Sequence, residues 1–465
     1  MSAKLFEQAT IKLINKNYVE ACQDFANVLL EDPNNAMAWN NRGLCLQALG
    51  HPFDAALHHD NAISLSPGAS AFLCNRGVCS YLLERYDDAI KFYRRALLED
   101  STNPEVNMNM GNVMRMRDRI DEAIYHYRQG LKGRPDYMDC KLALSMSLLQ
   151  AGQYEEGWKT FECRWKTTQL PPRGIPVPPW DGEDLAGKRI MVYSEQGHGD
   201  CLQFARYGVT LKERYPAATV FLEVRSQLYR LISTIGTVDG VVIFGDKVPS
   251  KLDYVCPMMS MPRLMGTTIE TIPVKQAWYH TDETRRAIWR DKLKAFPKKG
   301  LNIGICWAGM SRPGRPEADA IDRRRSTALI NFAPVMLTEG VNWVSLQQGP
   351  PREQVSTPIP GMTIGDWMDE ADDFYDTAAL IEELDLVISV DTAVAHVAAS
   401  VGKPTWVLSR FDNCWRWLGR RSDSPWYPTV RQFVQHKPND WSGLMGDVAR
   451  SLREFVEVQN AKAAA

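Results

Sequence analysis

The stretch LVISVDTAVAH, residues 386–396, has the form of a buried strand that runs directly into a helix. Its first five residues are apolar apart from one serine, and Asp391 and Thr392 mark the turn between the two elements. Free backbone N–H groups at Thr392, Ala393 and Val394 then lie beside the Thr392 hydroxyl and the positive end of the helix dipole. The stretch predicts a parallel sheet with an anion seat, suited to a diphosphate, at the start of this helix.

Two further side chains of this stretch each have two interpretations. Asp391 could cap the helix or bind sugar hydroxyls. His396 lies one helical turn beyond Thr392, where it could face the same anion or pack as a core histidine. The residues alone leave both interpretations open.

Short apolar runs alternate with helical segments from Gly187 onward, which is the pattern of α/β folds. Ligands of such parallel sheets bind at the carboxyl ends of the strands. We therefore expect two parallel-sheet lobes with a ligand cleft between them. The candidate strands are residues 189–194, 219–224, 240–244 and 253–256 in the first lobe, then, after a charged helix near 283–295, residues 301–307, 341–346, 386–390 and 405–408 in the second.

The first lobe carries SEQGHGD, residues 194–200, directly after its first candidate strand. Two glycines allow a tight turn into a helix, but the third glycine of the dinucleotide fingerprint is missing and Asp200 would repel a phosphate there. An acid at this place can instead accept a proton from an attacking hydroxyl. The alternative is that Asp200 only caps the helix.

The second lobe carries DRRRS, residues 322–326, in what we expect to be a polar loop. Arginine forks match phosphate oxygens, so Arg323, Arg325 and Ser326 are candidate anion contacts. A run of basic residues is also typical of a solvated surface.

Tryptophans are dense in CWRWL, residues 414–418, and DSPWYP, residues 423–428. They could stack on a base or sugar, or pin the C-terminal segment to the lobes. We expect the tryptophans to pack and Arg416 to contact a ligand.

The first third of the chain has a period of 34 residues, the length of a tetratricopeptide repeat. We expect five helix pairs between residues 2 and 168, the last one degenerate. The asparagines Asn41, Asn75 and Asn109 keep the same step and could bind an extended peptide on the concave face. Two helices of one repeat can approach closely only where a side chain is small, and a bulky residue of the second helix packs back against the first. The small positions are Ala21, Ala55, Ala89, Ala123 and Gly157, with Ala9, Gly43, Gly77, Gly111 and Ser145 on the first helices, and the bulky ones are Phe25, His59, Tyr93, Tyr127 and Phe161.

A proline-rich stretch at 169–186 follows the repeats and cannot be helical, so we expect a stiff, extended strap with a docked domain behind it. The predicted domains are residues 1–168, 169–186, 187–282 and 283–465.

Composition argues against several classes of function, although it leaves local charged patches and a nucleic-acid partner open. The formal net charge of −2 provides no global basic field for nucleic acid or acidic membranes. Ten scattered cysteines without a C-x-x-C pair, and an N-terminus without an apolar signal core, favour a reducing cytoplasm. No apolar run approaches the roughly 20 residues of a membrane helix.

Taken together, residues 187–435 resemble a two-lobed GT-B glycosyltransferase, specifically the heptosyltransferase-like module found behind tetratricopeptide repeats in bacterial and phage proteins. The layout is also similar to O-GlcNAc transferase. The resemblance implies an α-helical repeat solenoid followed by an α/β GT-B fold of two Rossmann-like lobes. The matching stretches are 194–200 with 203–204, 304–309, 325–326, 345–347, 376–380, 388–396, 415–418 and 424–428.

The resemblance implies that the second lobe holds a nucleotide-sugar, with its diphosphate at Thr392 and Ala393, while Asp200 is the base of an inverting transfer without a metal or resident cofactor. Position 198 is usually aliphatic in the module, so His198 is a second candidate for proton handling or for contact with the acceptor. Gln196 is a further expected acceptor contact. The loop from 310 to 323 also departs from the module and leaves the donor undetermined. The expected donor contacts are Asp391, Thr392, Ala393, Val394, His396, Arg323, Arg325, Ser326, Trp307, Gln347 and Arg416.

Three hypotheses follow for the acceptor and the activity. The repeats could present a protein or peptide as acceptor, with Asn41, Asn75 and Asn109 as contacts. The acceptor could instead be a glycan, a lipid-linked saccharide or a modified nucleobase, although a nucleic acid would bring a basic channel. The third hypothesis is a scaffold whose transferase module has lost activity, against which the joint presence of Asp200, Asp391, Thr392 and Arg325 argues.

Overall fold

The computed structural model describes residues 2–167, 173–296, 300–310, 316–357, 359, 361–419 and 421–464. Its contacts divide the chain into two compact units. The first comprises Met1–Ala151 with Cys163–Pro171, and the second comprises Gly152–Glu162 with Pro172–Ala465. Pro171 and Pro172 of the proline-rich stretch lie outside the described residues.

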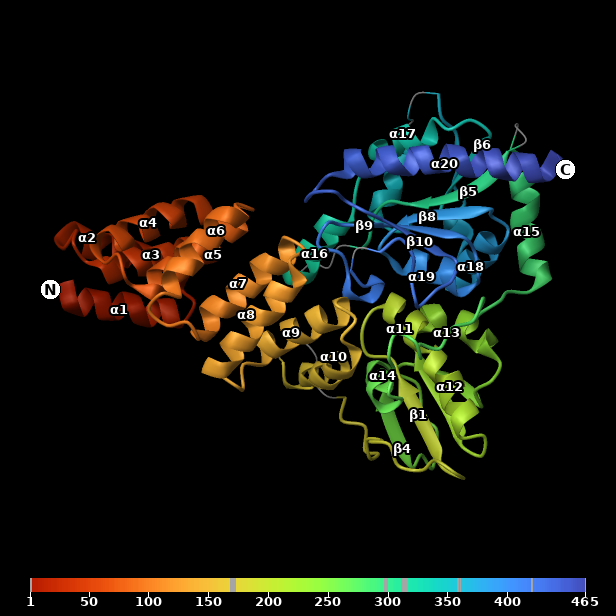
Figure 1. Cartoon of the computed structure of the whole chain (residues 1–465), viewed down its shortest axis with the longest axis horizontal. Coiled ribbons are helices and arrows are strands. Elements are labelled where there is room, and N and C mark those ends of the chain that lie inside the picture. The colour runs from red at the N-terminus through yellow and green to blue at the C-terminus, as the bar shows by residue number, and fades with distance from the viewer. Residues whose placement is uncertain are drawn as a thin grey trace. The chain divides into compact units, whose positions relative to one another are not determined.

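The first unit is a series of helical hairpins joined by short turns (Figure 1). The 34-residue period predicted this tetratricopeptide architecture, which is confirmed. Pro33, Pro67 and Pro135 stand in turns that follow helices, because proline cannot continue a helix. The helices are α1 (Ser2–Ile14), α2 (Tyr18–Glu31), α3 (Ala36–Ala48), α4 (Pro52–Leu65), α5 (Ser70–Leu82), α6 (Tyr86–Ala96), α7 (Pro104–Met116), α8 (Ile120–Gly133) and α9 (Met138–Gln150).

In three of the hairpins, a glycine of the first helix lies under a ring of the second helix. A Cβ atom on Gly111 would lie 2.5 Å from the Tyr127 ring, and one on Gly43 would lie 2.7 Å from the His59 ring. Gly77 meets Tyr93 in the same way. Only a residue without a side chain allows such an approach. The predicted match between small and bulky positions is confirmed in these three repeats.

Helix α10 (Tyr154–Phe161) follows α9 along the chain but belongs to the second unit. Trp158 is buried, with its ring centroid 5.9 Å from Phe204 and 5.5 Å from Trp415. Tyr154 accepts a hydrogen bond of 3.0 Å from the indole of Trp426. The sequence placed the end of the repeats at residue 168, whereas this aromatic cluster draws α10 into the unit that follows.

The first lobe of the second unit is a parallel sheet of order β3-β2-β1-β4. The described part of the proline-rich stretch lies along its edge, since Pro179 pairs with Val255 of β4. The strands are β1 (Arg189–Tyr193), β2 (Thr219–Val224), β3 (Gly240–Ile243) and β4 (Tyr254–Pro257), and the helices are α11 (His198–Phe204), α12 (Arg206–Arg214), α13 (Ser226–Ile232) and α14 (Met261–Leu264).

The second lobe is a parallel sheet of order β10-β9-β8-β5-β6-β7. In Figure 1, α20 runs along one side of this sheet, with α18 and α19 on the other. Every residue of β8 is buried, as expected for a central parallel strand. The strands are β5 (Leu301–Cys306), β6 (Val341–Ser345), β7 (Ile364–Gly365), β8 (Leu386–Val390), β9 (Thr405–Ser409) and β10 (Val430–Val434), and the helices are α15 (Glu283–Lys294), α16 (Pro316–Arg325), α17 (Ala333–Met336), α18 (Phe374–Glu382), α19 (Ala393–Ser400) and α20 (Trp441–Ala464).

All eight predicted strands are present, and the α/β prediction is confirmed. Two elements differ from the prediction. Strands β7 and β10 were not predicted. The segment that was expected to be a polar loop ends helix α16 instead, because Arg323 and Arg325 pair with Asp319 and Asp322 on the same helix. Residues 311–315 of the loop that departs from the resembled module lie outside the described residues.

Candidate active site

Three segments of the second unit converge at the carboxyl ends of β1 and β8. Helix α11 starts after β1, helix α19 starts after β8, and the two helices pack against each other. A Cβ atom on Gly199 would lie 2.7 Å from the His396 ring, so this glycine permits the close approach. The third segment is the short turn Trp415–Trp417, which contacts both helices through its side chains.

Asp200 lies in the first turn of α11 and has two kinds of partner. One carboxylate oxygen, Oδ2, accepts a hydrogen bond of 2.9 Å from the backbone N–H of Gly197. The other, Oδ1, forms an ion pair with the guanidinium of Arg416, whose Nε lies 2.5 Å away. Both side chains are largely buried, with 13% and 17% of their surface exposed. The N-cap of α11 is Gly197, so the alternative interpretation of Asp200 as the N-cap is wrong; Asp200 bonds back to Gly197 from the third helical position and also pairs with a charged residue of the second lobe.

Arg416 is fixed on several sides. Its guanidinium lies over the Trp415 ring, 4.3 Å from the centroid. Nη2 also donates to Oε1 of Gln196 at 3.4 Å, and Nη1 contacts the Cys414 sulfur at 3.4 Å. The sequence named Asp200, Gln196 and Arg416 separately, and the structure brings them together.

Asp391 does not cap α19, because Thr392 occupies the N-cap position. The Asp391 carboxylate instead accepts a hydrogen bond of 2.8 Å from the indole of Trp417, and its backbone carbonyl accepts one of 3.0 Å from Arg325. Burial alone would raise the pKa of Asp391, but the charges of Arg325 and Arg410 and the Trp417 hydrogen bond outweigh burial and lower that pKa. Asp391 is thus a buried carboxylate held in its ionised form.

The start of α19 has the geometry of an anion seat. Among the described residues, the backbone N–H groups of Ala393 and Val394 have no hydrogen-bond partner. These are first-turn amides, which the helix itself cannot satisfy. The Thr392 hydroxyl lies 3.2 Å from that of Ser389. The seat that the sequence predicted is therefore formed by backbone groups, with Thr392 turned toward β8.

His396 packs as a buried residue within the first turns of α19. Its Nδ1 lies 3.0 Å from the Tyr427 hydroxyl, and its ring stacks on Trp417 with centroids 4.9 Å apart. Burial lowers the pKa of His396 to about 4, so the ring is neutral near pH 7. This geometry favours the packing interpretation.

The other predicted donor contacts differ in their burial and in their hydrogen-bond partners. Gln347 Oε1 accepts hydrogen bonds from the backbone of Trp307 and Ala308 at 3.1 and 2.9 Å, which holds the loop after β5. Ser326 accepts from the backbone of Gly309 at 2.9 Å. Trp307 is fully buried, whereas Arg323 is 69% exposed and paired with Asp319. Arg325, by contrast, donates a hydrogen bond to the backbone carbonyl of Asp391.

His198 begins α11, and its ring lies 5.3 Å from that of Phe374, the first residue of α18. The tryptophans at 415, 417 and 426 are buried, which confirms their predicted packing role.

In the first unit, the amide nitrogens of Asn75 and Asn109 reach back to the preceding repeat, to Asn40 Oδ1 at 2.9 Å and Cys74 Sγ at 3.5 Å. Asn41 accepts a hydrogen bond of 3.3 Å from Asn40 and is only 7% exposed.

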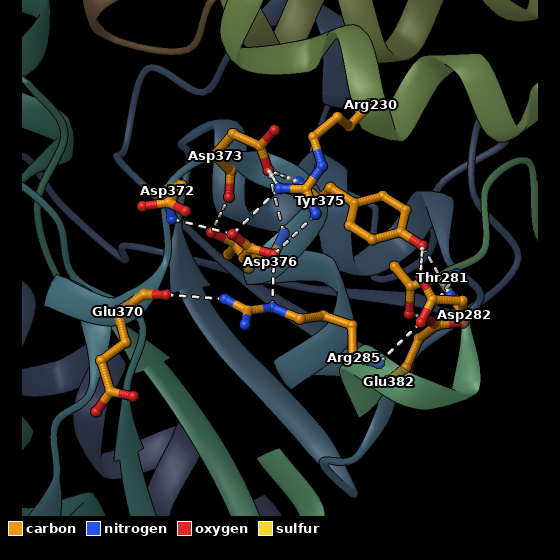
Figure 2. Close-up of polar contacts among 11 residues, drawn as sticks. Arg230, Thr281, Asp282, Arg285, Glu370, Asp372, Asp373, Tyr375, Asp376 and Glu382 are labelled. Carbon is orange, nitrogen blue, oxygen red and sulfur yellow. Dashed lines mark hydrogen bonds and ion pairs between the residues drawn. The ribbon is translucent and has the colours of Figure 1, made fainter. Parts of the chain in front are cut away.

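A second polar centre between the lobes was missed by the sequence reasoning (Figure 2). Asp376 of α18 is 1% exposed and accepts from Arg285 Nε at 2.7 Å and from Arg230 of α13 at 3.3 Å. Asp373 caps α18 and also contacts Arg230, at 3.2 Å. The stretch 376–380 was recognised as part of the resemblance, but nothing local pairs its acid with arginines that lie 91 and 146 residues earlier in the chain.

Asp282 and Thr281 complete this centre at the start of α15. Tyr375 donates to Asp282 Oδ2 at 2.6 Å, and the Thr281 backbone donates to Glu382 at 3.0 Å. Arg285 also donates to the Glu370 carbonyl at 2.9 Å. The whole network contains α13, α15 and α18, and so ties the two lobes together.

Comparisons with known proteins identify the class to which these features point. Residues 70–103 match the tetratricopeptide repeat family, and residues 373–411 match glycosyltransferase family 9, the heptosyltransferases. The second match contains α18, β8, α19 and β9, and hence Asp376, Asp391 and the anion seat. The chain thus combines tetratricopeptide repeats with a heptosyltransferase-like glycosyltransferase segment.

Among individual proteins, the chain is similar to Protein FlbA of Caulobacter vibrioides (strain ATCC 19089 / CIP 103742 / CB 15). The two are 29% identical over 337 residues, which are 68% of this chain and 55% of that relative, so the match spans little more than half of the relative's length. Solved structures with partial likeness include pilF of Pseudomonas aeruginosa, with 18% identity, a TM-score of 0.35 and coverage of 47% of this chain and 93% of that one. PilW, a type IV pilus biogenesis factor, has 22% identity, a TM-score of 0.33 and coverage of 36% and 79%.

No described helix combines the length and apolar character needed to cross a membrane. Within the same ranges, no three His, Cys, Asp or Glu side chains are grouped so that they could hold a metal ion.

Proposed function

We propose that the protein is an inverting glycosyltransferase that moves a sugar from a nucleotide-sugar to an acceptor hydroxyl. The observation that carries the proposal is the meeting of an acid, Asp200, with the amide seat at Ala393 and Val394, at the facing strand ends of two parallel-sheet lobes. The family 9 match at residues 373–411 supports the assignment of the seat to the donor.

In the proposed reaction, Asp200 takes the proton of the acceptor hydroxyl as its oxygen attacks the anomeric carbon from the face opposite the leaving group. The bond between that carbon and the diphosphate oxygen breaks, and the nucleoside diphosphate leaves with the electron pair. One displacement inverts the anomeric centre.

The leaving diphosphate gains negative charge, which helix α19 would stabilise through its free amides and its dipole. Arg416 and Arg325 would add positive charge beside them. We propose that this arrangement replaces a metal ion, and that the nucleotide-sugar is a co-substrate with no further cofactor. Asp391, a carboxylate beside the seat, is proposed to bind a hydroxyl of the donor through the oxygen that Trp417 leaves available.

We propose a protein or peptide as the acceptor, bound in part by the repeats and turned over in the cytoplasm. Support comes from the repeat architecture, which commonly presents concave surfaces to extended peptides. The amides of Asn75 and Asn109 bond to neighbouring repeats, so they would bind a peptide mainly through their carbonyl oxygens. If the acceptor is a glycan or a lipid-linked saccharide, the repeats would bind a protein other than the acceptor.

The test is a transfer assay with a panel of nucleotide-sugars and a cytoplasmic protein extract, read by intact-protein mass spectrometry. A preceding thermal-shift screen selects the donor, because a ligand that binds the folded state raises its melting temperature. We expect one donor to raise the melting temperature and to add one sugar mass to a polypeptide. If a donor stabilises the protein but only saccharide products form, the acceptor is a saccharide and not a polypeptide. If no donor stabilises the protein or yields a product, the proposed function is contradicted.

A further inference from the structure

We propose that Arg416 exchanges partners during the reaction, passing from the Asp200 carboxylate to the diphosphate of the donor, so that donor binding releases the base. This inference rests on the proposed function and adds to it a control of when the base is available.

Both oxygens of the Asp200 carboxylate have partners, and the ion pair with Arg416 occupies one of them, Oδ1. Nε and Nη2 of Arg416 both point at Oδ1 of Asp200, while Oδ2 accepts the Gly197 N–H. A carboxylate oxygen offers about two acceptor positions, so Oδ1 is filled by the two guanidinium donors. An acceptor hydroxyl cannot give its proton to Oδ1 while Arg416 stays there.

Arg416 is placed so that it can reach a diphosphate at α19 without a large movement. The next residue, Trp417, bonds to Asp391 and stacks on His396, which fixes the turn beside the first residues of α19. Among the described residues, Nη1 of Arg416 donates to the Cys414 sulfur alone, which is a weak acceptor, so this nitrogen gains most from a phosphate oxygen.

The Trp415 ring supplies the surface along which the guanidinium can shift. Stacking of a planar guanidinium on an indole is compatible with either partner, because it uses the face and leaves the N–H edge available. In the exchange, the ion pair between Arg416 and Asp200 breaks and an ion pair between Arg416 and the diphosphate forms. It also predicts that the donor binds productively before the acceptor.

The experiment is a double-mutant cycle read by calorimetric binding of inorganic pyrophosphate to the full chain. The variants are Asp200→Asn, which retains an oxygen for the Gly197 N–H, Arg416→Gln, and the double variant. In the wild-type background pyrophosphate has to displace Asp200 from Arg416, so Asp200→Asn should tighten binding about 10-fold. In the Arg416→Gln background the same change should give a gain of about 2-fold or less, because only long-range repulsion is relieved.

Equal gains in the two backgrounds would show simple charge repulsion and would overturn the exchange, as would no gain from Asp200→Asn. Thermal unfolding verifies that each variant folds, and Arg416→Met, which also removes the charge and retains an extended side chain, replaces Arg416→Gln if that variant is unfolded. Pyrophosphate binding by none of the folded proteins would overturn the anion seat and the exchange with it. If the protein transfers sugar but Asp200→Asn increases pyrophosphate affinity equally in both backgrounds, the proposed function is retained and only the exchange is contradicted.

Discussion

Two ion-pair centres join the lobes of the second unit, and they are built differently. At Asp200 one acid faces one arginine, and both belong to segments that follow strand ends. At Asp376 one buried acid accepts from two arginines and from the backbone N–H of Asp372, inside a network that extends to α15. In the proposed exchange, a negatively charged ligand takes the place of Asp200 beside Arg416, whereas Asp376 already accepts four hydrogen bonds from the protein.

This difference separates a reactive centre from a structural one. A fully satisfied buried network fixes the geometry of the elements that supply it. A single acid and a single arginine, beside the free amides of α19, leave room for a charged substrate to replace one partner of the pair. We therefore assign the Asp376 network to lobe positioning and the Asp200 pair to chemistry.

The largest effect on stability is expected at Asp376. Asp376→Asn removes the buried carboxylate that forms an ion pair with Arg285, and should lower the free energy of unfolding by about 3 kcal/mol. Urea unfolding followed by tryptophan fluorescence measures the change. Asp423→Asn, at an exposed acid paired with Arg421, is the matched control and should differ little from wild type. A loss at Asp376 no larger than the control would contradict its structural role.

A smaller effect is expected at Arg230, the member of the same network that comes from the first lobe. Its side chain is 45% exposed and Arg285 still compensates Asp376 after its removal. Arg230→Gln should therefore cost no more than about 1 kcal/mol, by the same unfolding measurement. A cost equal to that of Asp376→Asn would mean that the interlobe bond, and not the buried acid, determines stability.

The sequence predicted those parts of the fold that depend on local pattern. Gly77 and Tyr93 lie within one repeat, so their spacing alone predicted the contact between them. Strand β10 escaped prediction because Arg431 and Gln432 interrupt its apolar run, yet Gln432 is buried by hydrogen bonds to Trp417 and Asp423 backbone oxygens. When the buried polar side chains of a strand form hydrogen bonds with a separate loop, the sequence of the strand itself lacks the apolar pattern by which strands are predicted.

The site was predictable to the same extent. The sequence named Asp200 and Arg416 for their chemical types, but 216 residues separate them and only the fold makes them partners. Of the two interpretations of Asp391, the N-cap interpretation was wrong, because Thr392 is the N-cap. The Asp391 carboxylate instead accepts a hydrogen bond from the Trp417 indole, whose position periodicity cannot predict. The Asp376 network was missed since its arginines come from two distant helices.

The central claim is that Asp200 acts as a base and Asp376 does not. The most direct test is the rate of sugar transfer by Asp200→Asn, beside Arg230→Gln as a variant of the other centre, with the donor that stabilises the wild-type protein. We predict that Asp200→Asn lowers the turnover rate by about 10²–10⁴-fold while donor binding is retained, since general-base catalysis contributes effects of this size. Turnover by Asp200→Asn at the wild-type rate would contradict the claim.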